Sequence, residues 1–310
     1  MNTARTPIPD DLVQPFQIEV SSLRGRLARL GPVVDTILTR HAYPEAVAAM
    51  LGEAIALAVV LAGALKYDGV FTLQTKGDGP LHLLVADVTS AGAVRGYAQY
   101  DEARLQEVLG ARRPGGANAV PRLLGAGYIA FTVDQGEHSE RYQGIVELQG
   151  ASLTECAHHY FRQSEQIQAG IKTAVGRDPV SKAWRAGAIM LQRLPSEGLD
   201  AFALEAQEDG WRRAMVLMSS STSAELLDPA LAHNDLLFRL FHEDGVRVFD
   251  AHGLAARCRC SRERIERILR QLPADDNAEI AQDEEIRVTC EFCNSQYAFA
   301  RDEIAVAGTG

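Results

Sequence analysis

Two short cysteine pairs near the end of the chain constrain its fold more than any other feature. They are Cys258-x-Cys260 and, after 29 intervening residues (261–289), Cys290-x-x-Cys293. Four of the five cysteines of the chain lie in these pairs, whereas cysteines that only fill a core would be scattered. Thiolates are the ligands that Zn²⁺ takes in closed tetrahedral structural sites, often as two pairs separated by a small folded insert. The spacing therefore predicts one structural zinc ion held by Cys258, Cys260, Cys290 and Cys293.

A disulfide framework is the alternative explanation of paired cysteines. The chain opens with MNTARTPIPDD, which has no apolar run after a basic start, so we expect no secretory signal and a reducing, cytoplasmic location. In an extended segment, residues i and i+2 point to the same side with Cα atoms about 6.5–7 Å apart, so Cys258 and Cys260 can reach one metal. A disulfide prefers Cα atoms about 4.4–6.8 Å apart and a defined torsion. Zinc and a disulfide are therefore alternatives at this pair.

Length and charge narrow the class of protein. A chain of 310 residues with 46% hydrophobic content can bury a substantial core, and its length suggests two domains. The formal net charge of −10 disfavours a general nucleic-acid binder, which usually presents a basic face to phosphates. The longest apolar run, residues 54–65, has twelve residues. We expect it to form a buried helix from about Pro44 to Lys66, because it is too short to cross a membrane.

Short strand-like segments and helices in separate blocks make up the first 195 residues. This arrangement predicts an α+β fold with an antiparallel sheet and long helices, because a parallel sheet would alternate strands with helices. A helix that follows Ser152 and runs on through residues 163–166 is indicated by Glu155 at its third position, the pattern of a capping box. The expected strands are Pro15–Val20, continued less clearly by Ser21–Arg29, then Val70–Thr75, Leu81–Val88, Val94–Tyr100, Tyr128–Val133, Arg141–Leu148 and Trp184–Leu194.

The chain-breaking sequence Pro195-Ser196-Glu197-Gly198 predicts a domain boundary. We expect an N-terminal core domain at 1–195, a helical linker at 196–250 and a small C-terminal zinc-binding domain at 251–310. The linker should contain a helix from Leu199 to Leu227 and a second one, capped by Asn234 or Asp235, from Leu236 to His242. The segment 211–218 (WRRAMVLM) is either an ordinary packed amphipathic face or an adaptable apolar face that is exposed only in some states.

The predicted zinc domain is small. Ser261 should cap a helix whose apolar face is Ile265, Ile268, Leu269 and Leu272, and an acidic loop at 275–285 follows. A hairpin of strands 286–289 and 296–299 should carry the second cysteine pair, with Asn294 in the left-handed conformation. Because this domain has few large apolar residues, it should depend on its metal for folding.

Other candidate sites are weaker. Cys156 and His159 share a helical face, so a thiolate nucleophile is conceivable, but a lone cysteine among apolar neighbours is usually a buried core residue. The fragment Gly77-x-Gly79 lacks the third glycine and the following helix of a phosphate-binding loop. His233, His242 and His252 are possible spare ligands, though four cysteines already complete a zinc site.

Beyond these patterns, the chain resembles a known family, the redox-regulated holdase chaperones of the bacterial 33-kDa heat-shock protein family. The resemblance rests on the two cysteine pairs, with Ser261-Arg262-Glu263-Arg264 after the first and Tyr297 and Phe299 after the second. It covers nearly the whole chain, and Ala256 departs from it by replacing an aromatic residue. The upstream matches are His41-x-Tyr43-Pro44, Leu51-Gly52-Glu53, Leu73-Gln74, Gly77-x-Gly79-Pro80, Tyr142-Gln143-Gly144 and Ser164-Glu165-Gln166.

The resemblance implies a cytoplasmic chaperone, not an enzyme, that is inactive when reduced and zinc-bound. Oxidation would form the disulfides Cys258–Cys260 and Cys290–Cys293, release zinc and unfold the C-terminal domain and linker. Dimerisation through the N-terminal domain and binding of unfolding client proteins without ATP would follow. Neither nucleic acid nor a membrane is implied as a partner.

Two other functions remain open from the residues alone. A zinc-ribbon nucleic-acid adaptor would show salt-sensitive DNA or RNA binding. A dithiol oxidoreductase using Cys290-x-x-Cys293 would turn over disulfide substrates, although the strand-to-helix context of thioredoxin-like sites is missing.

Overall fold

The computed structural model describes residues 10–21, 23–110, 119–136, 141–162, 168–193, 201–271 and 285–304. The chain forms two compact units, Met1–Ala256 and Arg257–Gly310. Each combines helices with antiparallel strands, so the predicted α+β class is confirmed.

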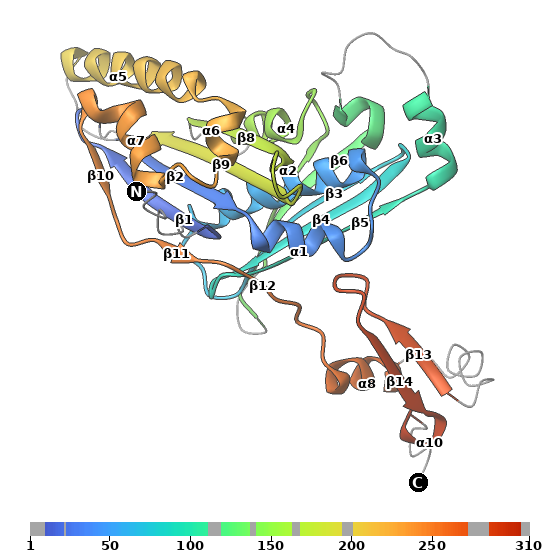
Figure 1. Ribbon diagram of the computed structural model, residues 1–310. Helices are drawn as coiled ribbons and strands as arrows, with labels where there is room; N and C mark the ends of the chain where they lie inside the picture. Colours follow the sequence, from blue (N-terminus) through green and yellow to red (C-terminus); the bar gives the residue numbers. More distant parts are fainter. Residues whose placement is uncertain are drawn as a thin grey trace, which may run out of the picture. The chain divides into compact units, whose positions relative to one another are not determined.

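The first unit contains two six-stranded sheets (Figure 1). In the first sheet the strand order is β10-β1-β2-β9-β8, and β11 also pairs with β1. The segment expected to extend the first strand instead turns back as β2, which pairs with β1 from Leu12↔Arg29 to Ile18↔Leu23. The strands are β1 Leu12–Ile18, β2 Leu23–Leu30, β8 Ala169–Arg177, β9 Trp184–Arg193, β10 Val246–Val248 and β11 His252–Gly253.

The second sheet has the order β12-β5-β4-β3-β6-β7. Its strands pair antiparallel except β12, which runs parallel to β5. Strands β3 and β4, which were expected at 70–75 and 81–88, pair as an antiparallel hairpin. Gly77 in this hairpin allows close packing, because a Cβ there would lie 2.0 Å from the carbonyl oxygen of Leu124. The strands are β3 Val70–Gly77, β4 Leu81–Thr89, β5 Ala93–Tyr100, β6 Gly127–Asp134, β7 Tyr142–Glu147 and β12 Ala255–Ala256.

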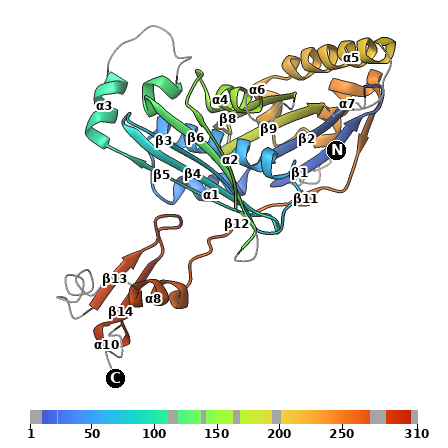
Figure 2. The ribbon, with the colours of Figure 1, turned by 180° about the vertical axis from the view of Figure 1, so that it is seen from behind.

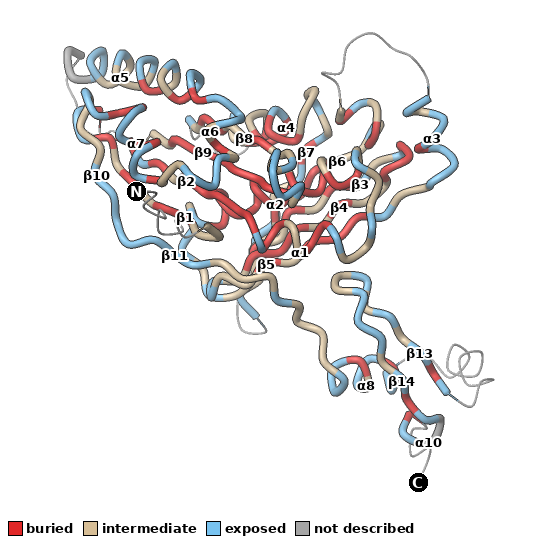
Figure 3. The backbone as a smooth tube through the Cα atoms, viewed as in Figure 1, coloured by how far each residue is buried: buried red, intermediate tan, exposed pale blue. Residues whose placement is uncertain are grey.

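Helix α2, Glu45–Ala62, packs against strands of both sheets (Figures 1 and 2). It is the one described helix that is long and apolar enough to cross a membrane. Most of its residues are buried inside the first unit, as Figure 3 shows, and small residues such as Gly52 let the strands approach closely. It is therefore the core helix that the sequence predicts, ending four residues earlier than expected.

The remaining helices of the sheet region are short. Ser152 caps α4 as predicted, because its hydroxyl oxygen accepts a hydrogen bond from the amide of Glu155. The continuation expected at 163–166 lies outside the described residues. Both α3 and strand β8 were absent from the sequence-based prediction. The helices are α1 Pro32–Thr39, α3 Glu102–Gly110, the π-helical turn η1 Val120–Leu124, and α4 Leu153–Tyr160.

Residues 201–241 form three helices on the first sheet. The helix expected over 199–227 is divided at Thr222, whose side chain and that of Glu225 form a capping box. The predicted cap at Asn234 or Asp235 is wrong, because Ala232 precedes the first helical residue and provides no side-chain cap. The elements are α5 Ala201–Ser220, α6 Ser223–Leu227, α7 His233–Phe241 and the 3₁₀ turn η3 His242–Asp244.

The second unit is built from α8, Arg262–Arg270, the hairpin of β13, Glu285–Thr289, and β14, Gln296–Ala300, and a final turn α10, Arg301–Ile304. Ser261 caps α8 as predicted. Ile268 is 52% exposed, so the apolar face of α8 is narrower than expected, and Leu272 lies outside the described residues. The buried apolar side chains are Ile265, Leu269, Ile286, Phe299 and Ile304.

Candidate metal centre

The four cysteines of the two pairs come together in the second unit. Cys258 and Cys260 directly precede α8, and Cys290 and Cys293 lie in the turn between β13 and β14. Their Sγ atoms all lie within 4.8 Å of one another. The Sγ atoms of Cys258 and Cys290 are 3.7 Å apart, and those of Cys260 and Cys293 are 3.3 Å apart.

These distances fit a tetrahedral metal and not a disulfide. Four thiolates at the Zn–S distance of about 2.3 Å place their sulfurs about 3.8 Å apart, whereas a disulfide bond is about 2.05 Å long. All four cysteines are free thiols and half-buried, and the described residues contain no other histidine, cysteine or carboxylate cluster of this kind. The site can therefore hold one thiophilic divalent ion.

The second pair is shaped by a tight turn. The amide of Asn294 donates to the carbonyl oxygen of Cys290 at 2.8 Å, and the amide of Cys290 donates to that of Ser295 at 2.9 Å. Asn294 has φ of 57°, the left-handed conformation predicted for it. A strand follows this turn in place of the helix that a thioredoxin-like dithiol would begin.

Two hydroxyl groups contact the sulfurs. Tyr297 donates to Cys260 Sγ at 3.2 Å, and the Ser295 hydroxyl lies 3.2 Å from Cys293 Sγ. Burial raises the pKa of the Cys260 thiol to about 12. At Cys293 burial acts in the same direction, but hydrogen bonds from Ser295 outweigh it and lower the pKa of the thiol to about 6. Only a cation among the sulfurs would stabilise all four as thiolates.

The sequence did not reveal the contact roles of Ser295 and Tyr297. The one feature of the sequence that could have indicated these contacts is that the two residues lie two and four positions after Cys293. The three histidines considered as spare ligands are not part of the cysteine cluster. His233 is buried in the first unit, His242 stacks on Phe238, and His252 lies in β11.

The alternative nucleophile, Cys156, is fully buried in α4. Burial raises the pKa of its thiol to about 11, and the nearby charge of Glu53 acts in the same direction. A thiol held protonated in the core does not act as a nucleophile at neutral pH.

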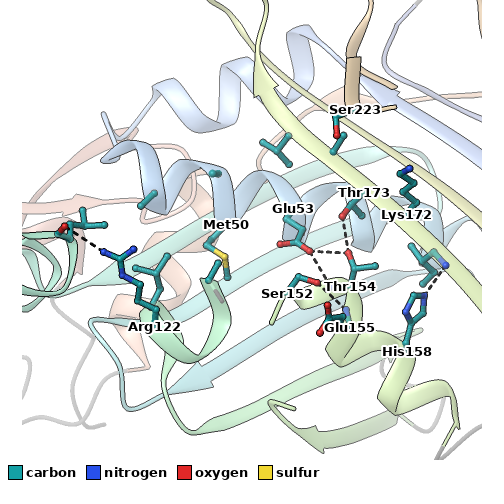
Figure 4. Close-up of a pocket in the computed structure, with 18 residues that line it drawn as sticks. Met50, Glu53, Arg122, Ser152, Thr154, Glu155, His158, Lys172, Thr173 and Ser223 are labelled. Atoms are coloured by element: carbon teal, nitrogen blue, oxygen red, sulfur yellow. Dashed lines mark hydrogen bonds between the residues drawn. The ribbon is translucent and has the colours of Figure 1, made fainter. Parts of the chain in front are cut away.

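Apart from the cysteine cluster, the first unit has a pocket of about 710 Å³ beside α2 and α4 (Figure 4). Glu53 points from α2 to the start of α4, where its Oε1 accepts hydrogen bonds from the amide and hydroxyl of Thr154 at 3.0 and 2.9 Å. The Thr154 hydroxyl also contacts that of Thr173 at 2.7 Å. Glu53 therefore caps α4 from a neighbouring helix, and burial raises the pKa of its carboxyl group.

The chain is similar over nearly its whole length to proteins of one family. A family model described as "Hsp33 protein" matches residues 11–300. A "33 kDa chaperonin" of Caulobacter vibrioides is 40% identical over 296 residues, covering 94% of this chain and 95% of the relative. One of Ectopseudomonas mendocina is 36% identical over 307 residues, with 97% of each chain covered.

A solved structure is also similar. The crystal structure of a 33 kDa chaperonin from Thermotoga maritima matches with a TM-score of 0.77 and 23% sequence identity, covering 95% of this chain and 96% of that one. This likeness concerns the fold. Because the family model and the curated relatives span nearly the entire sequence, the chain belongs to the Hsp33 family.

Proposed function

We propose that the protein is a redox-regulated chaperone of the holdase type, which binds unfolding proteins without ATP and is activated by oxidants. The cluster of four cysteines carries this proposal, because its sulfurs fit a metal when reduced and are an oxidisable set when the metal is absent. Membership of a family whose relatives are named chaperonins supports it.

In the reduced state Cys258, Cys260, Cys290 and Cys293 would hold one zinc ion, which supplies the charge that keeps four thiolates together. Among the described residues of the second unit, five apolar side chains are buried and stabilise it. In peptide models a structural zinc supplies about 10–16 kcal/mol of apparent binding energy. Loss of the ion should therefore unfold the unit.

Oxidation would use peroxide as the electron acceptor. One thiolate attacks a peroxide oxygen and becomes a sulfenic acid as the O–O bond breaks and hydroxide leaves. A second thiolate then attacks the sulfenic sulfur and displaces a second hydroxide to form the disulfide. We propose the pairs Cys258 with Cys260 and Cys290 with Cys293, each formed within one short segment. Cross-paired disulfides, Cys258 with Cys290 and Cys260 with Cys293, are the alternative that the reduced-state distances would favour.

The linker, residues 196–250, would change state with the second unit. Met218 and Ala214 of α5 are buried against Phe16 and Ile189 of the first sheet. Release of the helices would expose both apolar faces, which could then hold client segments. In this proposal residues 1–195 bind clients and form the homodimer, residues 251–310 are the switch, and the protein acts in the cytoplasm without nucleic acid or membrane.

The test is a peroxide titration of the zinc-loaded protein. Zinc release, peptide mapping of disulfides and suppression of aggregation of a heated client are followed together, before and after adding reductant. We expect one zinc per chain to leave as activity appears, and both changes to reverse on reduction with zinc. An oxidised protein that does not suppress aggregation would refute the proposal.

A further inference from the structure

A buried polar cluster lies where the α6–α7 loop, residues 228–232, crosses the first sheet. Arg185 of β9 donates from Nε to the carbonyl oxygen of Leu227 at 2.5 Å, and Arg29 of β2 donates to that of Leu231. Both side chains come from the sheet, and both acceptors are main-chain groups at the ends of the loop. The two arginines therefore fasten the helical segment 223–241 to the sheet.

Of the two arginines, Arg29 is fully buried and incompletely satisfied. Its Nε and one terminal nitrogen have no hydrogen-bond partner among the residues that the structure describes. Arg185, by contrast, also forms an ion pair with Asp10 at 2.7 Å. A buried guanidinium with unused donors carries a desolvation cost that hydration would relieve. Burying Arg29 therefore lowers the net free energy that holds the segment on the sheet.

His233, the first residue of α7, lies in the same cluster and is 5% exposed. Its Nε2 has no hydrogen-bond partner among the described residues. Burial lowers the pKa of the imidazole to about 4, and the positive charge of Arg29 adds to the effect. The charged groups around it are Arg29 on β2, Arg185 on β9 and Asp10 in front of β1, while Asp228 of the loop faces Arg29.

We propose that acid is a second trigger of this protein: protonation of His233 releases residues 223–241 from the first sheet while the cysteine cluster keeps its zinc. An imidazolium at this position would add a third positive charge beside two guanidinium groups and an N–H without an acceptor. Release would hydrate all three groups. It would also uncover the apolar contact between Leu237 and Phe241 of α7 and Phe16 of β1.

The direction of the effect follows from the two pKa values. A histidine with a pKa near 6.5 when released and about 4 when docked stabilises docking fully above pH 6.5, and this contribution is lost as the pH falls from 6.5 towards 4. The docking equilibrium should therefore weaken about 30-fold at pH 5 and remain nearly unchanged at pH 7.5. The opening follows from the cluster alone, whereas its use in client binding rests on the proposed function.

The test compares the reduced, zinc-loaded protein with the variant His233→Leu at the same pH, so that the intrinsic pH dependence of hydrogen exchange cancels. We expect the ratio of the α7 exchange rate in the unmodified protein to that in H233L to rise about 30-fold between pH 7.5 and pH 5. A chromogenic chelator reports zinc retention. His242→Gln is the matched control, because His242 is an exposed histidine at the end of the same helix.

A ratio of α7 exchange rates that is the same at pH 7.5 and pH 5 would overturn the inference, as would loss of zinc before opening. If H233L does not fold, judged by circular dichroism at pH 7.5, His233→Asn replaces it. Aggregation suppression at pH 5 is measured in parallel. Faster exchange without suppression would retain the acid-driven opening and count against the proposed client binding, so the two failures are distinguishable.

Discussion

At the scale of single residues, the cysteine cluster is supported by groups that are not themselves candidate ligands. Tyr297 donates a hydrogen bond to Cys260 Sγ, and Ser295 contacts Cys293. Hydrogen bonds to metal-bound thiolates offset their charge and fix their orientation. Mutation of such partners typically weakens metal binding by about 10- to 100-fold.

Tyr297→Phe is therefore expected to weaken zinc binding by about 10-fold, because only the hydroxyl donor is removed. Competition with a chromogenic chelator in the reduced protein measures the change. Tyr142→Phe is the control, since Tyr142 contributes its hydroxyl to a contact with Tyr160 in the first unit. An unchanged affinity in Y297F would show that the contact has no role in metal binding.

Substitutions of Glu53 test how its buried carboxyl group affects the stability of the first unit. Glu53→Gln keeps an oxygen that can accept from Thr154, whereas Glu53→Ala leaves that amide without its acceptor at a cost of about 1–3 kcal/mol. The raised pKa of Glu53 means that folding favours the protonated carboxyl, so this group's contribution to stability falls as pH rises through the unfolded value and up to the folded one. Urea unfolding followed by tryptophan fluorescence should show E53Q at least as stable as the unmodified protein at pH 8, and E53A less stable.

Sequence reasoning found the cysteines but not the polar cluster around Arg29. Cysteine spacing is a local signal, because each pair spans at most four residues. The burial of Arg29 depends on a loop about 200 residues away, with 202 residues separating it from Leu231. The sequence around it, LRGRLARL, gives no sign of which arginine is covered. Contacts between distant parts of the chain therefore determine which arginine is buried, and local sequence patterns do not show them.

At the scale of elements, turns account for most differences between prediction and structure. The β1–β2 turn occupies the positions where strand-like sequence continues, and the break at Thr222 divides an expected helix. Its capping box, Thr222-x-x-Glu225, is present in the sequence. The helical composition on both sides of it nevertheless predicts one continuous helix. Strand β8 has a glycine and alanine content that gives little strand propensity, and pairing with β9 supplies its stability.

The cap at Thr222 should matter for the helical segment. Thr222→Ala removes the acceptor for the Glu225 amide and is expected to cost about 1 kcal/mol. Hydrogen exchange should show faster opening of residues 223–227. Ser220→Ala is the matched control, because the Ser220 hydroxyl donates only to the carbonyl oxygen of Leu217 and caps no helix start. Equal exchange in the two variants would contradict a stabilising cap.

At the scale of the whole molecule, the two units differ greatly in the size of their cores. The first unit buries helix α2 between strands of two sheets, whereas the second unit buries five apolar side chains in the part that the structure describes. Small domains bury too little surface to fold without a further source of stability. The core of the first unit around α2 should therefore stay folded when the second unit loses its metal.

Chelation of zinc in the reduced protein is expected to unfold the second unit and leave the core of the first unit around α2 folded. Hydrogen exchange should show loss of protection in α8, β13 and β14 while α2 remains protected. Cys290→Ala should behave like the chelated protein, and Cys156→Ala should keep one zinc per chain, because Cys156 lies in α4 away from the cluster. Retained protection in the chelated hairpin would show that the second unit folds without metal.

All four clustered cysteines lie within residues 258–293 of a unit that begins just after Ala256. If the 54 residues from 257 to 310 unfold, they remain a tether with a root-mean-square span of about 40 Å. That span keeps the thiols at roughly millimolar effective concentration relative to one another. Under the proposed function, the return of the four thiols to one site after reduction would therefore be a first-order step within each chain, with zinc taken up from solution. Each molecule would then carry its own record of oxidation, whatever the concentration of the protein.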